Sequence, residues 1–192
     1  MKKYTYIVSL LLMFGLSSCE GIFVPDPIDP RLPKYTEEGN DVAGAFVDDL
    51  FWKSVVECHF SVTDEPQLML LPQKDSLILR FYGSTLDKSA SIEFYLKGSK
   101  VTQFSDLAAW EGKKILLNGI SGCGIYNDDE TSSVFRSQSG QFYLKHVDIT
   151  RKIISGTFGF TAIDNTGKII KIKSGRFDYC DPKIRGESRE DE

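Results

Sequence analysis

The segment IISGTFGFTAIDNTGKIIKIKSGRFD, residues 153–178, is the clearest β-hairpin in the sequence. In its first half a period-2 pattern places Ile154, Gly156, Phe158, Phe160 and Ala162 on one side and Ser155, Thr157, Gly159 and Thr161 on the other. The DNTG at residues 164–167 then supplies a turn, because Asp and Asn bond their own backbone and Gly accepts a positive φ. The segment therefore predicts two antiparallel strands with one apolar face and one small polar face.

Residues 140–178, which include this hairpin, resemble the closing segment of an uncharacterised family of Bacteroidota-type lipoproteins. Members of that family open the domain with a segment like T-x-x-G-x-N-x-F-G-C-L-V-N-G-x-x-W, and residues 36–52 here read TEEGNDVAGAFVDDLFW. Ala45 stands where the family often has Cys, and Asp48-Asp49 stands where it often has Asn-Gly. The resemblance covers the two ends of the domain and implies a lipoprotein of the same fold. It implies no activity, since the function of the family is undefined.

The N-terminus has the pattern of a lipoprotein signal peptide. Two lysines precede an apolar run at residues 7–14, and the motif LSSC follows at residues 16–19. The apolar run is too short to span a membrane. We therefore expect residues 1–18 to be removed and Cys19 to become a lipidated N-terminus, whose acyl chains anchor the protein in the membrane. The alternative is a buried N-terminal helix.

Residues 19–35 carry four prolines and few core-forming residues, which is typical of an extended tether. A recognition peptide is the alternative. Removal of residues 1–18 takes away two lysines and no acidic residue, so the formal net charge falls from -4 to about -6. This negative balance argues against nucleic acid or an anionic bilayer surface as the partner.

Residues 36–181 have the size of one domain, and a charged tail follows at residues 182–192. Short alternating segments separated by turn signals fill this domain, and one short helix is expected over residues 106–110, with Ser105 as its N-cap. The pattern predicts an all-β antiparallel meander that forms a β-sandwich or a partly closed barrel. The sequence leaves the choice between these two architectures open.

Smaller segments carry predictions of their own. A first hairpin is expected to turn at residues 48–49 and to bury Trp52 in the core. Residues 67–71 lie between two prolines, which limits them to an edge strand or a crossing loop. The glycines of residues 119–124 are interpreted as a flexible crossover, and residues 127–131 as an exposed loop.

Residues suited to catalysis are few. The two histidines, His59 and His146, are both expected on the outward face of a strand. Cys58 adjoins His59, but successive strand residues point to opposite faces and cannot form a catalytic pair. His146 and Asp148 share a face, where the acid can orient the imidazole, although a solvated strand face is the commoner arrangement. We therefore expect no catalytic residue and no cofactor.

Metal ligands are also sparse. Cys58, Cys123 and Cys180 lie far apart, without the close pairs of a zinc site. The acidic run at residues 127–130 lacks the spacing of a calcium-binding loop. We expect no metal site. With Cys19 lipidated, three thiols remain, and we expect no disulfide among them.

Aromatic residues provide the remaining functional signal. An outward aromatic ring can stack on a sugar or anchor a protein partner. The alternative is that these rings cover the ends of the core. The candidate binding residues are five aromatic residues and one histidine: Tyr82, Tyr95, Trp110, Tyr126, Tyr143 and His146.

Three functions remain open at this point. We favour a non-enzymatic lipoprotein of the outer membrane, on its periplasmic or its exterior face, whose β-domain binds a glycan or a protein partner. The alternatives are a small hydrolase whose site is invisible in the sequence and a structural subunit of a surface assembly. An exposed aromatic strip favours the first function, a pocket that joins His146 and Asp148 to another acid favours the second, and an unpaired edge strand favours the third.

Overall fold

The computed structural model describes residues 29–54, 68–72, 75–86, 88–98 and 100–184. Eight antiparallel strands close into a barrel in the order β1-β2-β4-β5-β7-β8-β9-β10, with β10 paired to β1. Because neighbours in the barrel also follow one another along the chain, the barrel is an up-and-down meander. The predicted all-β antiparallel fold is confirmed, and its architecture is a closed barrel.

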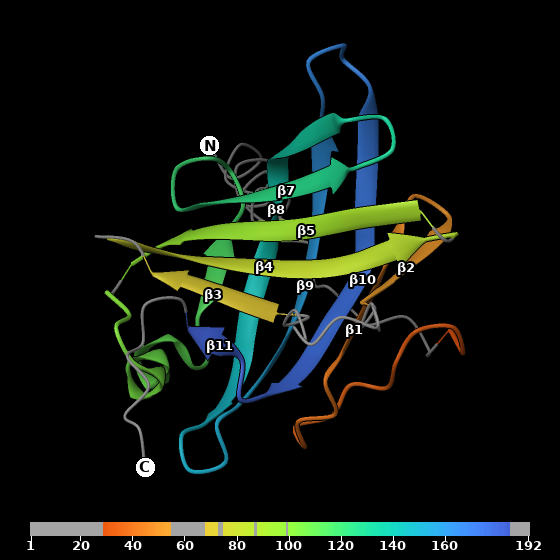
Figure 1. Cartoon of the computed structure of the whole chain (residues 1–192). Helices are drawn as coiled ribbons and strands as arrows, with labels where there is room; N and C mark the ends of the chain where they lie inside the picture. Colours follow the sequence, from red (N-terminus) through yellow and green to blue (C-terminus); the bar gives the residue numbers. More distant parts are fainter. Residues whose placement is uncertain (1–28, 55–67, 73–74, 87, 99, 185–192) are drawn as a thin grey trace, which may run out of the picture.

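Three short strands lie outside the closed ring. β3 pairs with β4, β11 pairs in parallel with β3, and β6 pairs with β8. Figure 1 shows β3, β4, β5 and β7 crossing β8, β9 and β10 steeply, so the barrel wall is made of two crossed layers. The elements are β1 Val42–Val47, β2 Leu50–Ser54, β3 Leu68–Pro72, β4 Ser76–Thr85, β5 Lys88–Lys97, the 3-10 helix η1 Phe104–Trp110, β6 Lys114–Leu116, β7 Gly122–Asp128, β8 Ser133–Asp148, β9 Ile153–Ile163, β10 Ile169–Cys180 and β11 Lys183–Ile184.

The β9–β10 hairpin has the alternation that its sequence predicts. Phe158 and Phe160 are buried, and the small polar residues between and around them face outward. In the turn, Asp164 Oδ1 accepts a hydrogen bond from the backbone N–H of Lys168 at 2.9 Å, and Gly167 has a φ of 89°. The turn chemistry and the buried face of this hairpin are therefore confirmed.

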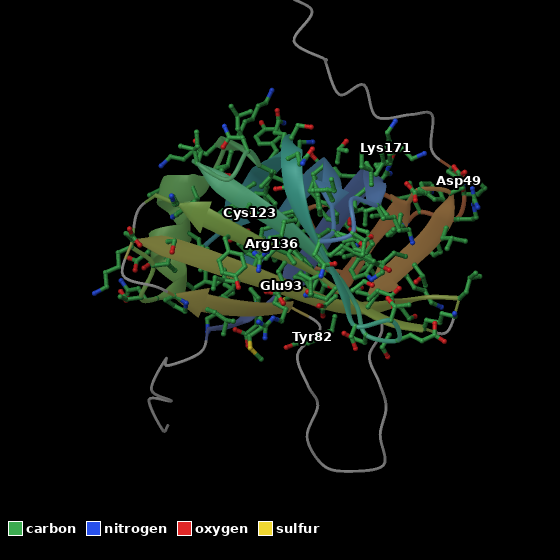
Figure 2. The ribbon with its side chains drawn as sticks, turned by 90° about the horizontal axis from the view of Figure 1, so that it is seen from above. Asp49, Tyr82, Glu93, Cys123, Arg136 and Lys171 are labelled. Carbon is green, nitrogen blue, oxygen red and sulfur yellow. The ribbon has the colours of Figure 1, made fainter. Side chains whose placement is uncertain are left out.

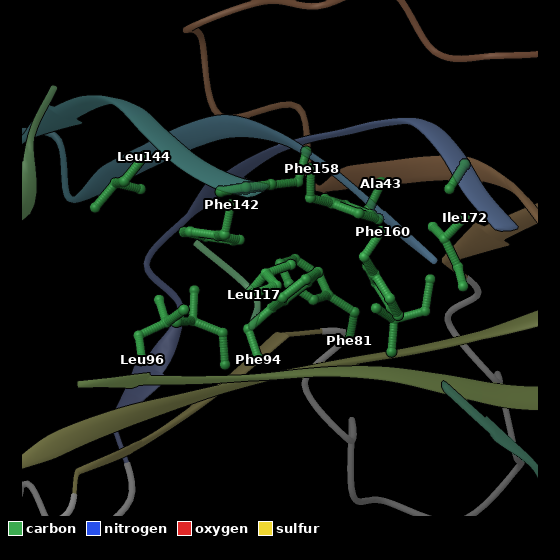
Figure 3. Packing of buried hydrophobic residues seen from close by; sticks show 14 of the residues in the cluster. Ala43, Phe81, Phe94, Leu96, Leu117, Phe142, Leu144, Phe158, Phe160 and Ile172 are labelled. Atoms are coloured by element: carbon green, nitrogen blue, oxygen red, sulfur yellow. The ribbon is translucent and has the colours of Figure 1, made fainter. Parts of the chain in front are cut away.

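Aromatic side chains fill the interior of the barrel. The ring centroid of Phe94 lies 4.8 Å from that of Phe142 and 4.9 Å from that of Phe158. Figure 3 shows Phe81 and Phe94 reaching from one layer toward Phe142 and Phe158 of the other. A Cβ on Gly175 would lie 2.3 Å from the Phe158 ring, so glycine is required where this ring crosses β10. The interior is thus a packed core of phenylalanine rings.

The first hairpin and the edge strand also agree with the sequence. The chain turns at residues 48–49, where Asp48 has a positive φ, and Trp52 is fully buried. Residues 68–72 form β3, which lies outside the closed ring as expected for a segment between prolines. Its outer side is paired only at Met69 and Leu70, with the two-residue β11.

Two predictions about loops are wrong. Gly122 and Gly124 lie in strand β7, not in a flexible crossover. A Cβ on Gly124 would lie 3.1 Å from the Phe160 ring, so this glycine makes room for a core side chain contributed by β9. Asn127 also lies in β7 and is half-buried, so the exposed loop begins only at Asp129.

The helix begins slightly earlier than predicted. η1 starts at Phe104, and its N-cap is Gln103, which forms a capping box with Asp106. Ser105 is therefore inside the helix and is not its cap. Within the described ranges, no helix is long and apolar enough to cross a membrane.

Several predictions fall outside the described residues. They concern the signal peptide and Cys19 within residues 1–28, Cys58 and His59 within residues 55–67, and the tail at residues 185–192. These remain predictions from the sequence.

Candidate functional site

The outer surface of the barrel divides into two walls. The Arg80 wall consists of the outward-facing residues of β4, β5, β7 and the first half of β8. The strap wall consists of the outward-facing residues of β1, β10, β9 and the second half of β8, and residues 29–40 cross it as a strap. Figure 2 shows Tyr82, Glu93 and Arg136 along one side of the molecule and Lys171 at another.

A hydrogen-bonded network occupies the centre of the Arg80 wall. Arg80 and Glu93 stand opposite each other on β4 and β5, and Arg80 Nε donates to Glu93 Oε1 at 2.9 Å. Arg80 Nη1 donates to the Tyr82 hydroxyl at 3.3 Å. Asn127 Nδ2, on β7, lies 3.0 Å from both Ser91 Oγ and Glu93 Oε1. The Glu93 side chain is only 9% exposed. Arg80 on β4 and Asn127 on β7 donate hydrogen bonds that compensate its buried charge.

This network is suited to presenting fixed polar groups. The hydrogen bond to Tyr82, and then the hydrogen bond and charge of Glu93, raise the pKa of Arg80 above its usual value. The guanidinium therefore stays charged, and it holds the Glu93 carboxylate in one orientation. Groups held in this way position a ligand well, but they do not release a proton readily.

Two of the predicted aromatic candidates lie on the Arg80 wall and two are buried. Tyr82 is half-buried on β4, and Tyr95, on β5, is 37% exposed. Tyr126 faces into the barrel from β7, and Trp110 packs against Gly98 at the end of η1 with 1% of its surface exposed. Trp110 and Tyr126 are therefore core residues, and the prediction that they contribute an exposed aromatic surface is corrected.

His146 lies on the strap wall but does not pair with Asp148. His146 Nδ1 lies 3.3 Å from Glu111 Oε1. Asp148 instead begins the β8–β9 turn, where it accepts hydrogen bonds from the backbone N–H of Arg151 at 2.9 Å and from Arg151 Nε at 2.6 Å. Its position in the turn explains why the expected His-Asp pair does not form.

The surroundings of His146 lack the contacts of a nucleophile and its base. Ser155 stands opposite His146 in the register of β8 and β9, but its hydroxyl lies 3.0 Å from the Tyr35 hydroxyl. His146 Nε2 is buried and has no hydrogen-bond partner among the described residues. Glu111, His146 and Ser155 thus form a row without the serine-to-histidine hydrogen bond that nucleophilic catalysis requires.

Asp178 fastens the strap to the barrel. Its buried carboxylate accepts hydrogen bonds from the Thr36 hydroxyl, from the backbone N–H of Gly39 at 2.9 Å and from the backbone N–H of Asn40 at 3.2 Å. Thr36, Gly39 and Asn40 belong to the opening motif described above, and Asp178 closes the C-terminal segment that shares the resemblance. The two ends of the domain meet at this carboxylate.

The N-terminal part of the strap packs on β1. Leu32 is buried, and a Cβ on Gly44 would lie 2.6 Å from Pro33 Cδ, so glycine allows the strap to approach. The Arg31 guanidinium lies 4.6 Å from the centroid of the Phe46 ring. The described part of the predicted tether therefore lies against the barrel.

Arg176 lies beneath the strap and is 6% exposed. Its Nε donates to the carbonyl oxygen of Ser174 and its Nη1 to the carbonyl oxygen of Pro33, both at 3.4 Å. Burial lowers the pKa of this guanidinium. No ion pair joins Arg176 to a carboxylate within the described part of the chain.

The remaining cysteines and acids add no further site. Cys123 and Cys180 are free thiols in the described part of the chain, and Cys58 lies outside it. In the described residues, no three His, Cys, Asp or Glu side chains come together in a way that could hold a metal ion.

Sequence reasoning missed the Arg80 network. Its members come from three strands, and no spacing in the sequence marks them as a group. The alternation of β4 and β5 could have placed Arg80 and Glu93 outward, but their pairing depends on the register between the two strands.

The fold and its walls define a class: an up-and-down antiparallel β-barrel with a packed interior and polar outer walls. Comparisons with protein-family models, with curated proteins and with solved structures found no match. The two walls are therefore the surfaces that bear on function.

Proposed function

We propose that the protein is a non-enzymatic lipoprotein of the outer membrane, anchored through Cys19, and that its barrel binds a glycan or a protein partner through the Arg80 wall. The filled interior supports a surface site, because phenylalanine rings occupy the space in which a larger barrel holds a ligand. The observation that carries the proposal is the exposed Tyr95 ring on the same wall as the hydrogen-bonded Arg80–Glu93 pair.

The Arg80 wall combines two kinds of contact. Tyr82 and Tyr95 supply aromatic surface, which contributes much of the free energy of binding in sugar and protein recognition. Arg80, Glu93 and Asn127 supply polar groups whose positions are fixed before a partner arrives, so little conformational entropy is lost on binding.

A hydrolase is the second candidate, and the row Glu111, His146 and Ser155 is the observation that favours it. The Ser155 hydroxyl is buried and bound to Tyr35, so substrate reaches it only if the strap moves. If His146→Ala, made in a folded protein, lowers a measured turnover more than about a hundredfold, general acid or base catalysis replaces our proposal.

The structural subunit is the third candidate. The edge strands β11 and β6 contain two and three residues, so each offers another chain only a short template for pairing. This argues for recognition through side chains on the wall.

The anchor is tested by Cys19→Ala. We expect the protein to move from the membrane fraction to the soluble fraction or to remain unprocessed, because the acyl chains supply the attachment. Normal maturation together with unchanged membrane retention would contradict a lipid anchor at Cys19.

The wall is tested by a photoreactive amino acid placed at Tyr95. We expect covalent adducts with a partner when whole cells are irradiated, and the same probe at Lys171, exposed on the strap wall, serves as the matched control. For a glycan partner, the purified protein is applied to an array of envelope polysaccharides, and Tyr95→Ala should lose the signal. Adducts at Lys171 but none at Tyr95, with an array signal that Tyr95→Ala leaves intact, would place the site elsewhere.

A further inference from the structure

Arg176 is a buried cation on the outside of the barrel. Its guanidinium has several N–H donors, and the described residues offer it only two carbonyl oxygens, each at 3.4 Å. Buried charges in proteins are normally paired with an opposite charge, because an unpaired one loses its hydration without compensation. The chain therefore leaves part of the binding capacity of this guanidinium unused.

Two hydroxyl groups continue the row across the strap wall. Arg176 stands opposite Thr157, and Thr157 stands opposite Tyr143. All three point outward, because a buried phenylalanine adjoins each of them along its strand. Opposite side chains are about 5 Å apart at Cβ, so the three groups can reach one small ligand. Neither hydroxyl donates to another described residue.

Three acids of this wall are hydrogen-bonded to groups other than Arg176, and none of the three forms an ion pair with its guanidinium. Asp178 accepts the N–H groups of the strap, Glu37 accepts the Tyr35 hydroxyl, and Glu111 accepts the backbone N–H of Val147. Two lysines add positive charge nearby. The Lys114 ammonium lies 5.3 Å from the centroid of the Tyr143 ring, and the Lys145 ammonium lies 3.9 Å from the centroid of the Tyr35 ring.

We propose that Arg176, Thr157 and Tyr143 form an oxyanion site at the edge of the strap, and that its ligand is a phosphate group. The planar guanidinium donates to two oxygens of the group at once, which favours a phosphate over a monatomic anion such as chloride. The two hydroxyls donate to further oxygens that a carboxylate does not have. The phosphate is either free in solution or part of a lipid headgroup.

The test is thermal unfolding of the full-length protein with increasing inorganic phosphate, compared with chloride at equal ionic strength. A ligand that binds only the folded state stabilises it by mass action, so we expect the Tm to rise with phosphate and to follow a saturation curve. Tyr143→Phe and Thr157→Val each remove one hydroxyl with little change of shape, and each should weaken the apparent affinity for phosphate about threefold to tenfold. Arg176→Lys keeps the positive charge but loses the two parallel N–H donors of the guanidinium, so it should weaken the apparent affinity for phosphate more than about tenfold.

Lys171→Met is the matched control, because it removes a positive charge from an exposed position of the same strand. Its response to phosphate should equal that of the wild type. Tyr143→Phe and Thr157→Val test the site independently of Arg176, so the experiment gives an answer even if Arg176→Lys does not fold. A wild-type Tm that does not saturate with phosphate, or equal responses in the wild type, Tyr143→Phe and Thr157→Val, would overturn the proposal.

A second measurement separates the two sources of phosphate. The chain that begins at Glu20, which lacks both the predicted signal peptide and the predicted acyl anchor, is sedimented with phosphatidylglycerol vesicles in the presence and absence of inorganic phosphate. Co-sedimentation that inorganic phosphate reverses and that Tyr143→Phe weakens identifies a headgroup ligand. A phosphate-dependent Tm without co-sedimentation identifies a free ligand. Co-sedimentation that neither inorganic phosphate nor Tyr143→Phe alters counts against this site.

Discussion

Two outward-facing arginines show how the walls of the barrel differ. On the Arg80 wall, Arg80 has Glu93 opposite it in register, with Nε 2.9 Å from a carboxylate oxygen. On the strap wall, Arg176 has Thr157 opposite it, and its hydrogen bonds end on carbonyl oxygens at 3.4 Å. The chain pairs Arg80 with its own carboxylate, whereas we assign an external anion as the partner of Arg176.

Burial alone does not identify a functional arginine, because the partners of the two side chains differ. The pKa of Arg80 is raised by Tyr82 and Glu93, whereas the pKa of Arg176 is lowered by burial. A paired cation is part of a rigid surface, whereas Arg176 has no carboxylate partner among the described residues and is the group that we assign to an external phosphate. We therefore assign recognition by shape and aromatic contact to the Arg80 wall and recognition of charge to the strap wall.

The largest expected effect comes from Phe158→Ala, because this ring supports both walls from inside. Phe158 is buried and packs against Phe81 and Phe94 of the opposite layer. Its truncation should lower the free energy of unfolding by about 3–5 kcal/mol, measured by urea denaturation. That loss approaches the whole stability of a domain of this size. Ile169→Ala, at an exposed position, is the control, and an equally small loss in both variants would contradict a shared core.

The second prediction separates the strap wall from the core. Asp178→Ala removes the acceptor of the N–H groups of Gly39 and Asn40, and it should lower the free energy of unfolding by about 3 kcal/mol. It should also expose the strap to trypsin at Lys34 while the barrel remains folded by circular dichroism. Asp129→Ala, in an exposed turn, is the control. A strap as resistant as in the wild type would show that Asp178 does not hold it.

The third prediction concerns the Arg80 wall. Glu93→Gln keeps the size of the side chain and removes the charge that pairs with Arg80, so it should lower the free energy of unfolding by about 1–3 kcal/mol. Glu130→Gln breaks an exposed pair with Lys88 and should leave the unfolding curve unchanged. If the two variants behave alike, the Arg80–Glu93 pair is a surface pair and the contrast between the walls is lost.

Local patterns explain how much of the fold could be predicted. The alternation around Phe158 and the turn at residues 164–167 lie within one segment, so the hairpin could be recognised without knowledge of the rest. Closure of the barrel could not, because it depends on the pairing of β1 with β10 and of β4 with β5. Gly124 was misread because the ring that requires it, Phe160, comes from another strand.

The sites depend even more on distant contacts. Arg176 meets Pro33 across 143 residues of sequence, and Asp178 meets Gly39 across 139. No periodicity within a strand reports such contacts. Tyr95 could be placed outward because its neighbours alternate with it, whereas Tyr126 was misplaced because its strand was interpreted as a loop.

The smallest effect on stability, and the sharpest test of the comparison, is expected for Tyr95→Ala. This ring is partly exposed and belongs to no hydrogen-bonded network that the described residues form, so its loss should change the free energy of unfolding by no more than about 0.5 kcal/mol. If the Arg80 wall binds a partner, the same change should weaken that binding at least about tenfold, since central aromatic residues dominate interface energies. Leu86→Ala removes a more exposed apolar side chain outside the wall and should leave binding intact. The phosphate response of the strap wall should also be unchanged in Tyr95→Ala, because the two walls act independently. A Tyr95→Ala protein that binds its partner normally but no longer responds to phosphate would reverse our assignment of the two walls.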